Sequence, residues 1–369
     1  MRVLFALPGL HRWDRGAEVA FIEVATALAN AGDEVTLIGS GPPREGTAYR
    51  YIRAASVDRS VFNRFPSLPF VRNEYAYEEL TFAPGLLSRF RPSAFDVTVT
   101  CSYPFTNWAL RRPAWSERRP PHVFVTQNGD WPATHDNAEY RFFGCDGLVC
   151  TNPDFYARNK EKWRCALIPN GVDVARFTPG PPQRSAFGLP GDRMIVLMVS
   201  AFVDFKRVMA GIEAVSRLPE AHLVVAGDGP LREKALQKAN ELMPGRFTRV
   251  SAPASQMPDL YRSADVFLHM AFAESFGNVY VEALACGLPV VGHNSARLRW
   301  ILGDAGYLVD TNDADAVAAM IAQAAQSGSA DSGRRVTQAA GFSWSRIGAQ
   351  YRAFLRDVAR MEEGGFKRD

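Results

Sequence analysis

The chain has 369 residues, of which 47% are hydrophobic, 11% aromatic and 22% charged, a composition that excludes collagen-like, low-complexity and largely disordered proteins. Its length predicts two domains. The formal net charge of +3 is too small to indicate nucleic acid or an anionic membrane as a partner by itself. The sequence has no run of about 18 apolar residues, so we expect no transmembrane helix.

In the first half, short apolar runs predict strands, and helical-period segments lie between them. The expected strands are Val3–Leu7, Glu34–Ile38, Phe95–Thr100, His122–Thr126, Gly147–Cys150 and Ala166–Pro169. Between the first two strands, Val19, Ile22, Ala25 and Ala29 recur at helical spacing and Gly32 ends the helix. A strand, a helix and a strand within about 40 residues indicate a parallel βαβ unit.

The Pro-rich segment Phe177–Pro182 predicts an interdomain linker, because neither a helix nor a central strand continues through it. A second α/β series follows, with a helix over Arg232–Glu241. Its strands are expected at Ile195–Val199, Leu223–Ala226, Phe247–Val250, Asp265–Leu268 and Leu288–Val291. The sequence therefore predicts two doubly wound halves, with ligands bound in a central cleft beyond the strands' carboxyl ends.

The last helix is expected over Trp344–Met361, with Ile347, Tyr351, Phe354 and Val358 at spacings of three and four. Such a stripe should pack on another surface. Residues 362–369 form a charged tail that we expect to be frayed.

The strongest motif is a pair of glutamates eight residues apart, Glu274 and Glu282, with Gly277 between them. We expect a short helix to begin near Gly277, so that its free N–H groups suit a phosphate. Glu282, about one turn deeper, can accept from two neighbouring hydroxyls, as on a ribose, while Glu274 holds a sugar. The alternative is a capped helix with two solvated acids.

Several motifs in register resemble retaining GT-B glycosyltransferases of family four. They are Glu274–Glu282 with Gly287-Leu288-Pro289, Asn170-Gly171-Val172-Asp173, Gly227-Asp228-Gly229-Pro230, and Tyr261 with Ala264-Asp265. The resemblance covers nearly the whole chain. It implies an α/β GT-B fold of two Rossmann-like domains. The first, 1–176 plus 345–369, binds the acceptor, and the second, 183–344, binds the nucleotide-sugar donor.

The resemblance also implies site residues. Glu274 contacts the donor sugar and Glu282 the nucleoside ribose, while the stretch Ser275, Phe276, Gly277, Asn278 and Val279 supplies backbone amides to the sugar and diphosphate. No convincing D-x-D motif or metal-ligand spacing is found, so we expect neither a metal nor a cofactor.

Lys206 and Arg207 follow a strand, where cations can neutralise the charge of a leaving diphosphate. Many relatives carry an arginine where Ala201 stands, and we expect Arg207 to supply the second positive charge. The alternative is a basic helix start without a ligand.

Gly16 stands before the first helix, in a loop where relatives have paired glycines facing the donor phosphate; Ala17 replaces the second glycine. A lone glycine there also reads as a simple turn. Asn128 follows another strand, where similar enzymes often place a histidine. Asparagine cannot act as a general base, and the resemblance then implies that the departing phosphate oxygen removes the proton. Asp130 is the competing base, with turn capping as its alternative role.

The segment 44–119 has 12 basic and 7 acidic residues among aromatic ones that include Phe62, Phe65, Phe70 and Trp115. In the family's architecture it belongs to the acceptor domain. It suits either an anionic, lipid-linked acceptor at a membrane surface or a solvated face over an ordinary core.

We therefore expect a cytoplasmic, metal-independent hexosyltransferase that moves a sugar from a UDP- or GDP-hexose to an acceptor hydroxyl with retention, with peripheral contact at the inner face of the membrane as an option. The five cysteines fit a reducing compartment. Two alternatives are a nucleotide-sugar-binding protein without transfer activity, and a phosphorylase or epimerase on the same fold.

Overall fold

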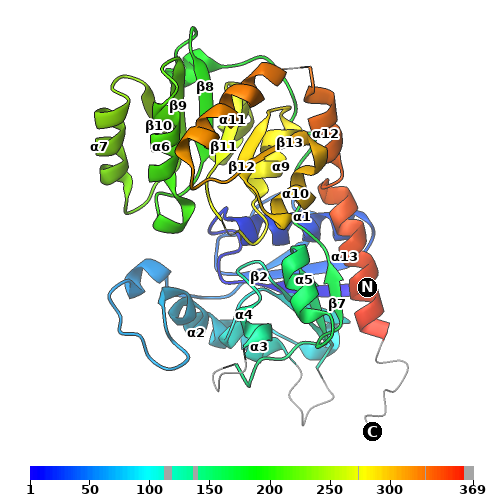
Figure 1. The fold of residues 1–369 in the computed structure, drawn as a ribbon. Coiled ribbons are helices and arrows are strands. Elements are labelled where there is room, and N and C mark those ends of the chain that lie inside the picture. The colour runs from blue at the N-terminus through cyan, green and yellow to red at the C-terminus, as the bar shows by residue number, and fades with distance from the viewer. Residues whose placement is uncertain (112–118, 136–139, 273, 329, 361–369) are drawn as a thin grey trace. The chain divides into compact units, whose positions relative to one another are not determined.

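The structure is a computed structural model that describes residues 1–111, 119–135, 140–272, 274–328 and 330–360. Its contacts divide the chain into two compact units, drawn in Figure 1: Met1–Asn170 with Trp344–Asp369, here the N-terminal unit, and Gly171–Ser343, the C-terminal unit. Trp115, Met361 and the charged tail lie outside the described residues. None of the described helices combines the length and the hydropathy that a membrane span requires.

The N-terminal unit contains a seven-stranded, parallel sheet in the order β3-β2-β1-β4-β5-β6-β7. Its strands are β1 (Arg2–Ala6), β2 (Glu34–Gly39), β3 (Arg50–Arg53), β4 (Val97–Thr100), β5 (His122–Val125), β6 (Gly147–Cys150) and β7 (Cys165–Leu167). Its helices are α1 (Gly16–Asn30), α2 (Glu74–Leu87), α3 (Phe105–Leu110), α4 (Trp131–Thr134), α5 (Pro153–Asn159) and α13 (Trp344–Ala359).

Side chains of β1 alternate between two cores. Val3 and Phe5 pack in a cluster with residues of α1 and α13, whereas Leu4 and Ala6 join Phe82 of α2 on the other face of the sheet. Because successive side chains of a strand point to opposite faces, this division explains why the strands are apolar throughout: both faces of the sheet are covered.

The C-terminal helix α13 packs against α1 in the same unit. The stripe Ile347, Tyr351, Phe354 and Val358 is buried, which confirms the prediction that it packs on another surface. A Cβ on Gly348 would lie 2.4 Å from the Cβ of Ala27, so glycine permits the close approach of the two helices.

The C-terminal unit contains a six-stranded parallel sheet in the order β10-β9-β8-β11-β12-β13. Its strands are β8 (Met194–Val199), β9 (Ala221–Ala226), β10 (Phe247–Val250), β11 (Val266–His269), β12 (Val290–His293) and β13 (Gly306–Val309). Its helices are α6 (Val208–Ser216), α7 (Arg232–Leu242), α8 (Met257–Arg262), α9 (Asn278–Ala285), α10 (Ala296–Leu302), α11 (Ala314–Ser327) and α12 (Ser332–Ala340). One core lies under α6, α7 and α11, and the other under α8, α9, α10 and α12.

The predicted α/β class with two doubly wound sheets is confirmed, and the predicted strands lie within three residues of the observed ones. The edge strands β3 and β13 were not predicted. The segment Phe177–Pro182 is an irregular stretch of the C-terminal unit. Phe177 is buried there with its ring centroid 5.9 Å from that of Tyr261, so the compact unit begins earlier than the expected linker.

Each sheet changes its winding direction at one pair of strands. From β1 the chain proceeds outward through β2 and β3, then returns to place β4 on the other side of β1; β8 and β11 are related in the same way. Ligands of open parallel sheets bind outside the carboxyl ends of the strands at such a point. In the C-terminal unit this position lies between the ends of β8 and β11.

Candidate functional site

Lys206 and Glu274 meet at the winding change of the C-terminal sheet. Lys206 ends the short 3₁₀ helix Asp204–Lys206 after β8, and Glu274 lies in the loop after β11. The Lys206 Nζ donates a hydrogen bond to Glu274 Oε1, and the two groups form an ion pair. The structure thus brings together two residues predicted from motifs nearly 70 positions apart.

His269, the last residue of β11, also contacts Glu274. Its Nε2 lies 2.9 Å from the same Glu274 Oε1, and its side chain is only 1% exposed. Burial alone would raise the pKa of Glu274, but the His269 hydrogen bond and charge, together with Lys206, lower it to about 2. Sequence reasoning missed His269; the available signal was a polar residue at the end of a buried strand.

The loop between Glu274 and α9 turns at Gly277, which has φ +91° and is the N-cap of α9. A Cβ there would lie 2.6 Å from the Tyr280 ring, so both the conformation and the space require glycine. Phe276 is buried, and its ring packs against those of Trp300 and Phe342. Its side chain therefore anchors the loop, and only its backbone is suited to a ligand.

The other predicted members of this stretch lie at the start of α9. Ser275 precedes the turn, whereas Asn278 and Val279 begin the helix, and all three are half-buried. The N–H groups at the start of the eight-residue α9 carry the positive end of its dipole. This arrangement matches the predicted helix start near Gly277.

Glu282 lies further along α9, half-buried. Its Oε2 accepts a 2.7 Å hydrogen bond from the hydroxyl of Tyr261. Burial raises the pKa of Glu282, and the Tyr261 hydrogen bond opposes that rise. The structure therefore links two of the sequence motifs, the second glutamate and the tyrosine of α8.

Arg207 has protein partners where the prediction needs a phosphate. It adopts φ +55°, and its guanidinium donates to the Met270 and Thr311 carbonyls, the Thr311 hydroxyl and the Asn312 side chain. It also lies 3.8 Å from the centre of the Phe272 ring. These contacts tie three loops together, and Arg207 as a phosphate ligand stays a prediction.

A small pocket, open to solvent, adjoins Glu274. Arg297 of α10 lines it and donates from Nη1 to the Glu274 carbonyl, which fixes the loop backbone. The remaining lining residues are Ala271, Phe272, Tyr280, His293, Ser295, Leu298 and Ile301. Sequence reasoning missed Arg297 because nothing near it in the chain marks it as a neighbour of Glu274.

The glycines of Gly227-Asp228-Gly229 allow β9 to end against the loop after β8. A Cβ on Gly227 would lie 2.1 Å from the Ser200 carbonyl oxygen, and one on Gly229 would lie 2.7 Å from that of Phe202. This motif therefore shapes the backbone that leads to Lys206. Ala201, in the same loop, is exposed.

In the N-terminal unit, Gly16 and Asn128 follow the carboxyl ends of two strands of the same sheet. Gly16 is the exposed first residue of α1, after β1, and Asn128 is exposed in the turn after β5. One strand, β4, separates β1 from β5. Both residues stay candidates, since no bound group tests them.

Asp130 has partners that the predicted roles did not include. It is buried, and its carboxylate accepts from Arg158 Nε and Nη2 at 3.0 and 2.9 Å and from Asn159 Nδ2 at 2.9 Å. At the N-cap of α4 its side chain makes no capping bond, so the capping alternative is wrong. Because the carboxylate joins α4 to α5, we do not retain it as a base.

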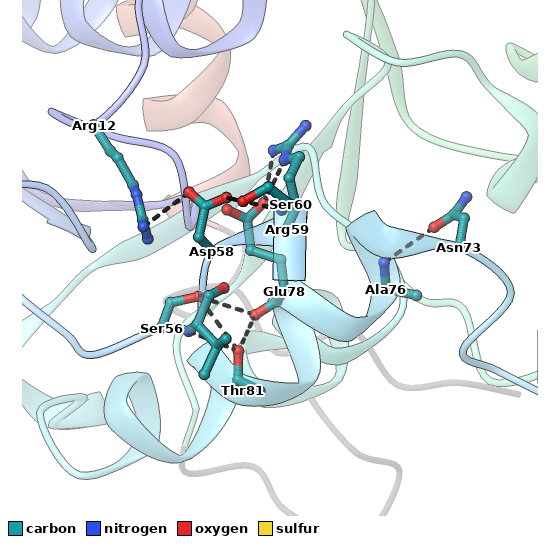
Figure 2. A network of polar contacts seen from close by, with 10 residues as sticks. Arg12, Ser56, Asp58, Arg59, Ser60, Asn73, Ala76, Glu78 and Thr81 are labelled. Atoms are coloured by element: carbon teal, nitrogen blue, oxygen red, sulfur yellow. Dashed lines mark hydrogen bonds and ion pairs between the residues drawn. The ribbon is translucent and has the colours of Figure 1, made fainter. Parts of the chain in front are cut away.

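The loop after β1 is held by a polar network shown in Figure 2. Arg12 pairs with Asp58 at 2.8 Å, and Arg59 Nη2 lies 2.6 Å from Glu78 Oε2. A Cβ on Gly9 would lie 2.0 Å from Glu18 Oε1, so the loop folds directly onto the buried carboxyl of Glu18, whose pKa burial raises. No sequence motif indicates this acidic cluster.

Two family models match this chain. The family model "Glycosyl transferases group 1" matches residues 181–340, and "Glycosyltransferase Family 4" matches residues 15–176. The lipopolysaccharide core biosynthesis glycosyltransferase LpsE of Rhizobium meliloti is 28% identical over 84% of this chain and 85% of its own. A GDP-mannose-dependent phosphatidylinositol monomannoside mannosyltransferase of Mycolicibacterium smegmatis is 35% identical over 41% of this chain and 44% of its own.

Solved structures share the fold. Sucrose-phosphate synthase of Thermosynechococcus elongatus has a TM-score of 0.75 and 20% identity, over 97% of this chain and 98% of its own. HepE of Anabaena, solved with UDP and glucose, has a TM-score of 0.74 and 17% identity, over 97% and 100%. The two doubly wound sheets therefore define a GT-B protein.

The chain belongs to the retaining glycosyltransferases of family four, also called glycosyltransferase group 1. It is accordingly a glycosyltransferase that uses a nucleoside-diphosphate sugar as its donor.

Proposed function

We propose that the C-terminal unit binds a UDP- or GDP-hexose at Lys206, Glu274 and the start of α9, and that the N-terminal unit binds the acceptor. The observation that carries this proposal is the Lys206–Glu274 pair at the winding change of the sheet, next to an open pocket. HepE was solved with UDP and glucose, and the mycobacterial relative is GDP-mannose-dependent, which supports both donor types.

Charge separation explains what each group does. The Lys206 ammonium and the N–H groups of α9 stabilise the negative charge that develops on the leaving diphosphate. The Glu274 carboxylate, ionised at neutral pH, accepts hydrogen bonds from the hexose hydroxyls. Glu282, already held by Tyr261, accepts from the ribose.

The transfer replaces one carbon–oxygen bond by another. The bond between the anomeric carbon and the diphosphate breaks, the acceptor oxygen bonds to the same face of that carbon, and the acceptor proton passes to the departing phosphate oxygen. No side chain has to act as a base in this scheme, which agrees with the placement of Asn128 and with the bonds that occupy Asp130.

The donor site is tested by a panel of UDP-, GDP- and dTDP-hexoses in thermal shift, followed by hydrolysis and transfer with the sugar nucleotide that stabilises most. Glu274→Gln should reduce kcat/KM at least about tenfold, because a charged acceptor for the sugar is lost. Glu233→Gln is the matched control: Glu233 is an exposed residue of α7 that pairs with its neighbour Arg232. Equal kcat/KM in Glu274→Gln and Glu233→Gln would contradict the proposed site.

The same panel separates the alternatives. Ala17, Ala201 and Asn128 stand where relatives commonly have other residues, which motivates the hypothesis of a binder without transfer activity. Turnover of any donor excludes that hypothesis. Reaction with free phosphate, or a 2-epimer formed without an acceptor, would instead indicate a phosphorylase or an epimerase.

For the acceptor, we infer a lipid-linked glycan met at a membrane surface on the cytoplasmic side. Seven large apolar side chains between residues 57 and 87 are exposed: Val57, Val61, Phe65, Leu68, Tyr75, Leu80 and Leu87. Arg64, Arg72, Arg89 and Arg91 of the same region are exposed too. Apolar side chains interspersed with arginines suit the interface of an anionic bilayer. LpsE acts in lipopolysaccharide core biosynthesis, which supports this class of acceptor.

Vesicle flotation tests this inference. The protein should float with phosphatidylglycerol vesicles and not with phosphatidylcholine vesicles, and Phe65→Ser with Leu68→Ser should abolish flotation while leaving donor hydrolysis unchanged. Leu242→Ser, at an exposed leucine of the C-terminal unit, is the control. Equal flotation of all these variants would refute the assignment of the segment.

A further inference from the structure

The two nitrogen neighbours of Glu274 differ in their freedom to move. Lys206 and His269 both contact Oε1 of the carboxylate. The Lys206 side chain is 20% exposed, and Lys206 ends a short 3₁₀ helix after β8. The His269 side chain is 1% exposed, and His269 ends a strand in the middle of the sheet. Lys206 can therefore turn toward a ligand, but His269 stays in place.

The surroundings of His269 determine which nitrogen carries the proton. A carboxylate oxygen only accepts hydrogen bonds, so Nε2 is the donor to Glu274. Among the described residues, the buried Nδ1 has no hydrogen-bond partner. The imidazole lies parallel to the Phe267 ring and edge-on to the Tyr280 ring at 5.0 Å. The Nε2 proton of His269 is therefore directed at Glu274.

A bound donor changes which groups contact the Glu274 carboxylate. The diphosphate attracts the Lys206 ammonium, because its oxygens carry more charge than one carboxylate. A largely buried carboxylate that loses its cation is stabilised only by the hydrogen bonds that remain. In the described structure, His269 is the fixed side-chain donor that can supply one.

We propose that His269 is a positioning residue that holds the Glu274 carboxylate ionised and oriented toward the donor sugar while Lys206 serves the diphosphate. This inference rests on the proposed role of Glu274 as the ligand of the donor sugar. It assigns to the end of β11 a function that the sequence motifs do not contain.

The test separates the sugar from the diphosphate. His269→Leu should weaken binding of the donor nucleotide sugar about tenfold or more, because a hydrogen bond to a charged group is lost. It should leave the affinity for the corresponding free UDP or GDP unchanged. His269→Gln, whose side-chain amide can donate from a similar position, should restore most of the loss. His222→Leu is the matched control, since His222 is a buried histidine of β9 bonded to Thr248 at 2.8 Å.

The pH profile gives a second readout. The groups that face Glu274 are Lys206 from the loop after β8, His269 from β11, Tyr280 from α9, His293 from β12 and Arg297 from α10. In His269→Leu the pKa of Glu274 should rise, because burial is then opposed by Lys206 alone. Donor affinity should consequently fall at a higher pH on the acid side than in the wild type.

Each outcome decides one question. The positioning role is overturned if His269→Leu weakens binding of the nucleotide sugar and of the free nucleotide equally. It is also overturned if the only effect of His269→Leu is a lower melting temperature, as expected for His222→Leu. If Glu274→Gln weakens the nucleotide sugar but His269→Leu does not, the inference fails and the proposed function stands. If Glu274→Gln itself leaves donor affinity unchanged, the proposed function fails. If His269→Leu does not fold, two other variants decide the question. A wild-type pH profile in His269→Gln together with a shifted profile in His269→Asn would support the positioning role. Identical profiles in these two variants would oppose it.

Discussion

Glu79 of the N-terminal unit and Glu274 of the C-terminal unit are both carboxylates largely removed from water, yet their pKa values move in opposite directions. Burial raises the pKa of Glu79 to about 8, against hydrogen bonds from Thr106. Burial acts in the same sense on Glu274, but His269 and Lys206 lower its pKa to about 2. The shared residue type and the shared burial therefore do not decide the charge state.

The neighbours account for the difference. The Glu79 carboxylate receives the Thr106 backbone N–H at 3.2 Å and lies next to the like charge of Glu78, which raises its pKa further. This acid ties α2 to α3. Glu274 instead has a cation and an imidazole on one oxygen. An ionised acid in a loop after a strand, next to a pocket, is a candidate ligand site, whereas a neutral acid between helices is part of the core.

Glu78 extends the comparison, because it is buried in the N-terminal unit yet keeps a cation (Figure 2). Arg59→Met removes that cation while retaining the apolar stem, and leaves the Glu78 carboxylate buried without its ion pair. We expect a loss of about 3–5 kcal/mol in the stability of the N-terminal unit. Hydrogen exchange of the α2 amides measures this loss within that unit.

The double variant Arg59→Met with Glu78→Gln is the control for this first prediction. It should recover much of the stability, because the uncompensated charge is gone. A double variant as unstable as Arg59→Met alone would show that the packing of Arg59 over the Tyr75 ring, at 4.2 Å, matters more than the ion pair.

Lys206→Ala should bring the pKa of Glu274 part of the way toward that of Glu79, because His269 still donates to its carboxylate. The transfer rate should fall about 10²- to 10³-fold, because a cation at the leaving diphosphate is lost. The pKa of Glu274 is now lowered, so its charge is present at neutral pH and lost only as the pH falls toward about 2. Without Lys206 this loss should begin at a higher pH, and kcat/KM measured from pH 4.5 to 8 should show a new acid limb.

Lys206→Arg keeps the charge and provides the control. It should retain the wild-type pH profile even if the rate falls, because the cation beside Glu274 is preserved. An acid limb in Lys206→Arg equal to that of Lys206→Ala would mean that the charge of residue 206 does not set the state of Glu274.

Sequence patterns predicted the fold wherever strands are buried on both faces. The two missed strands, β3 with Arg50–Arg53 and β13 with Gly306–Val309, are edge strands of their sheets. Most residues of these two strands are half-buried or exposed. β3 has an arginine at each end, and β13 is a run of only four residues, so neither stands out in the sequence. Strand order, and with it the winding change beside Lys206, came only from the structure.

For the site, the motifs placed Lys206, Glu274 and Glu282, because their chemistry is tied to short segments. His269 and Arg297 could not be found in that way, since their roles depend on which side chains lie next to them in space. Asp130 shows the reverse: its position after a strand suggested a base, but Arg158 and Asn159 of α5 occupy its oxygens. Spacing in the chain does not reveal such partners.

Glu79→Gln gives the smallest of the expected effects and tests the other side of the comparison. A folded-state pKa of about 8, above the ordinary value for glutamate, means that the folded protein disfavours ionisation of Glu79. The N-terminal unit should therefore lose stability as the pH rises from about 5 to 8.

Glutamine can still accept the Thr106 N–H and has no charge to lose. Glu79→Gln should therefore be more stable than the wild type near pH 8, by on the order of 1–3 kcal/mol, and no different from it near pH 4. Melting curves at both pH values measure this, with transfer activity unchanged because Glu79 lies between α2 and α3. A variant that is destabilised equally at both pH values would show that Glu79 acts through its hydrogen bonds and not through its protonation.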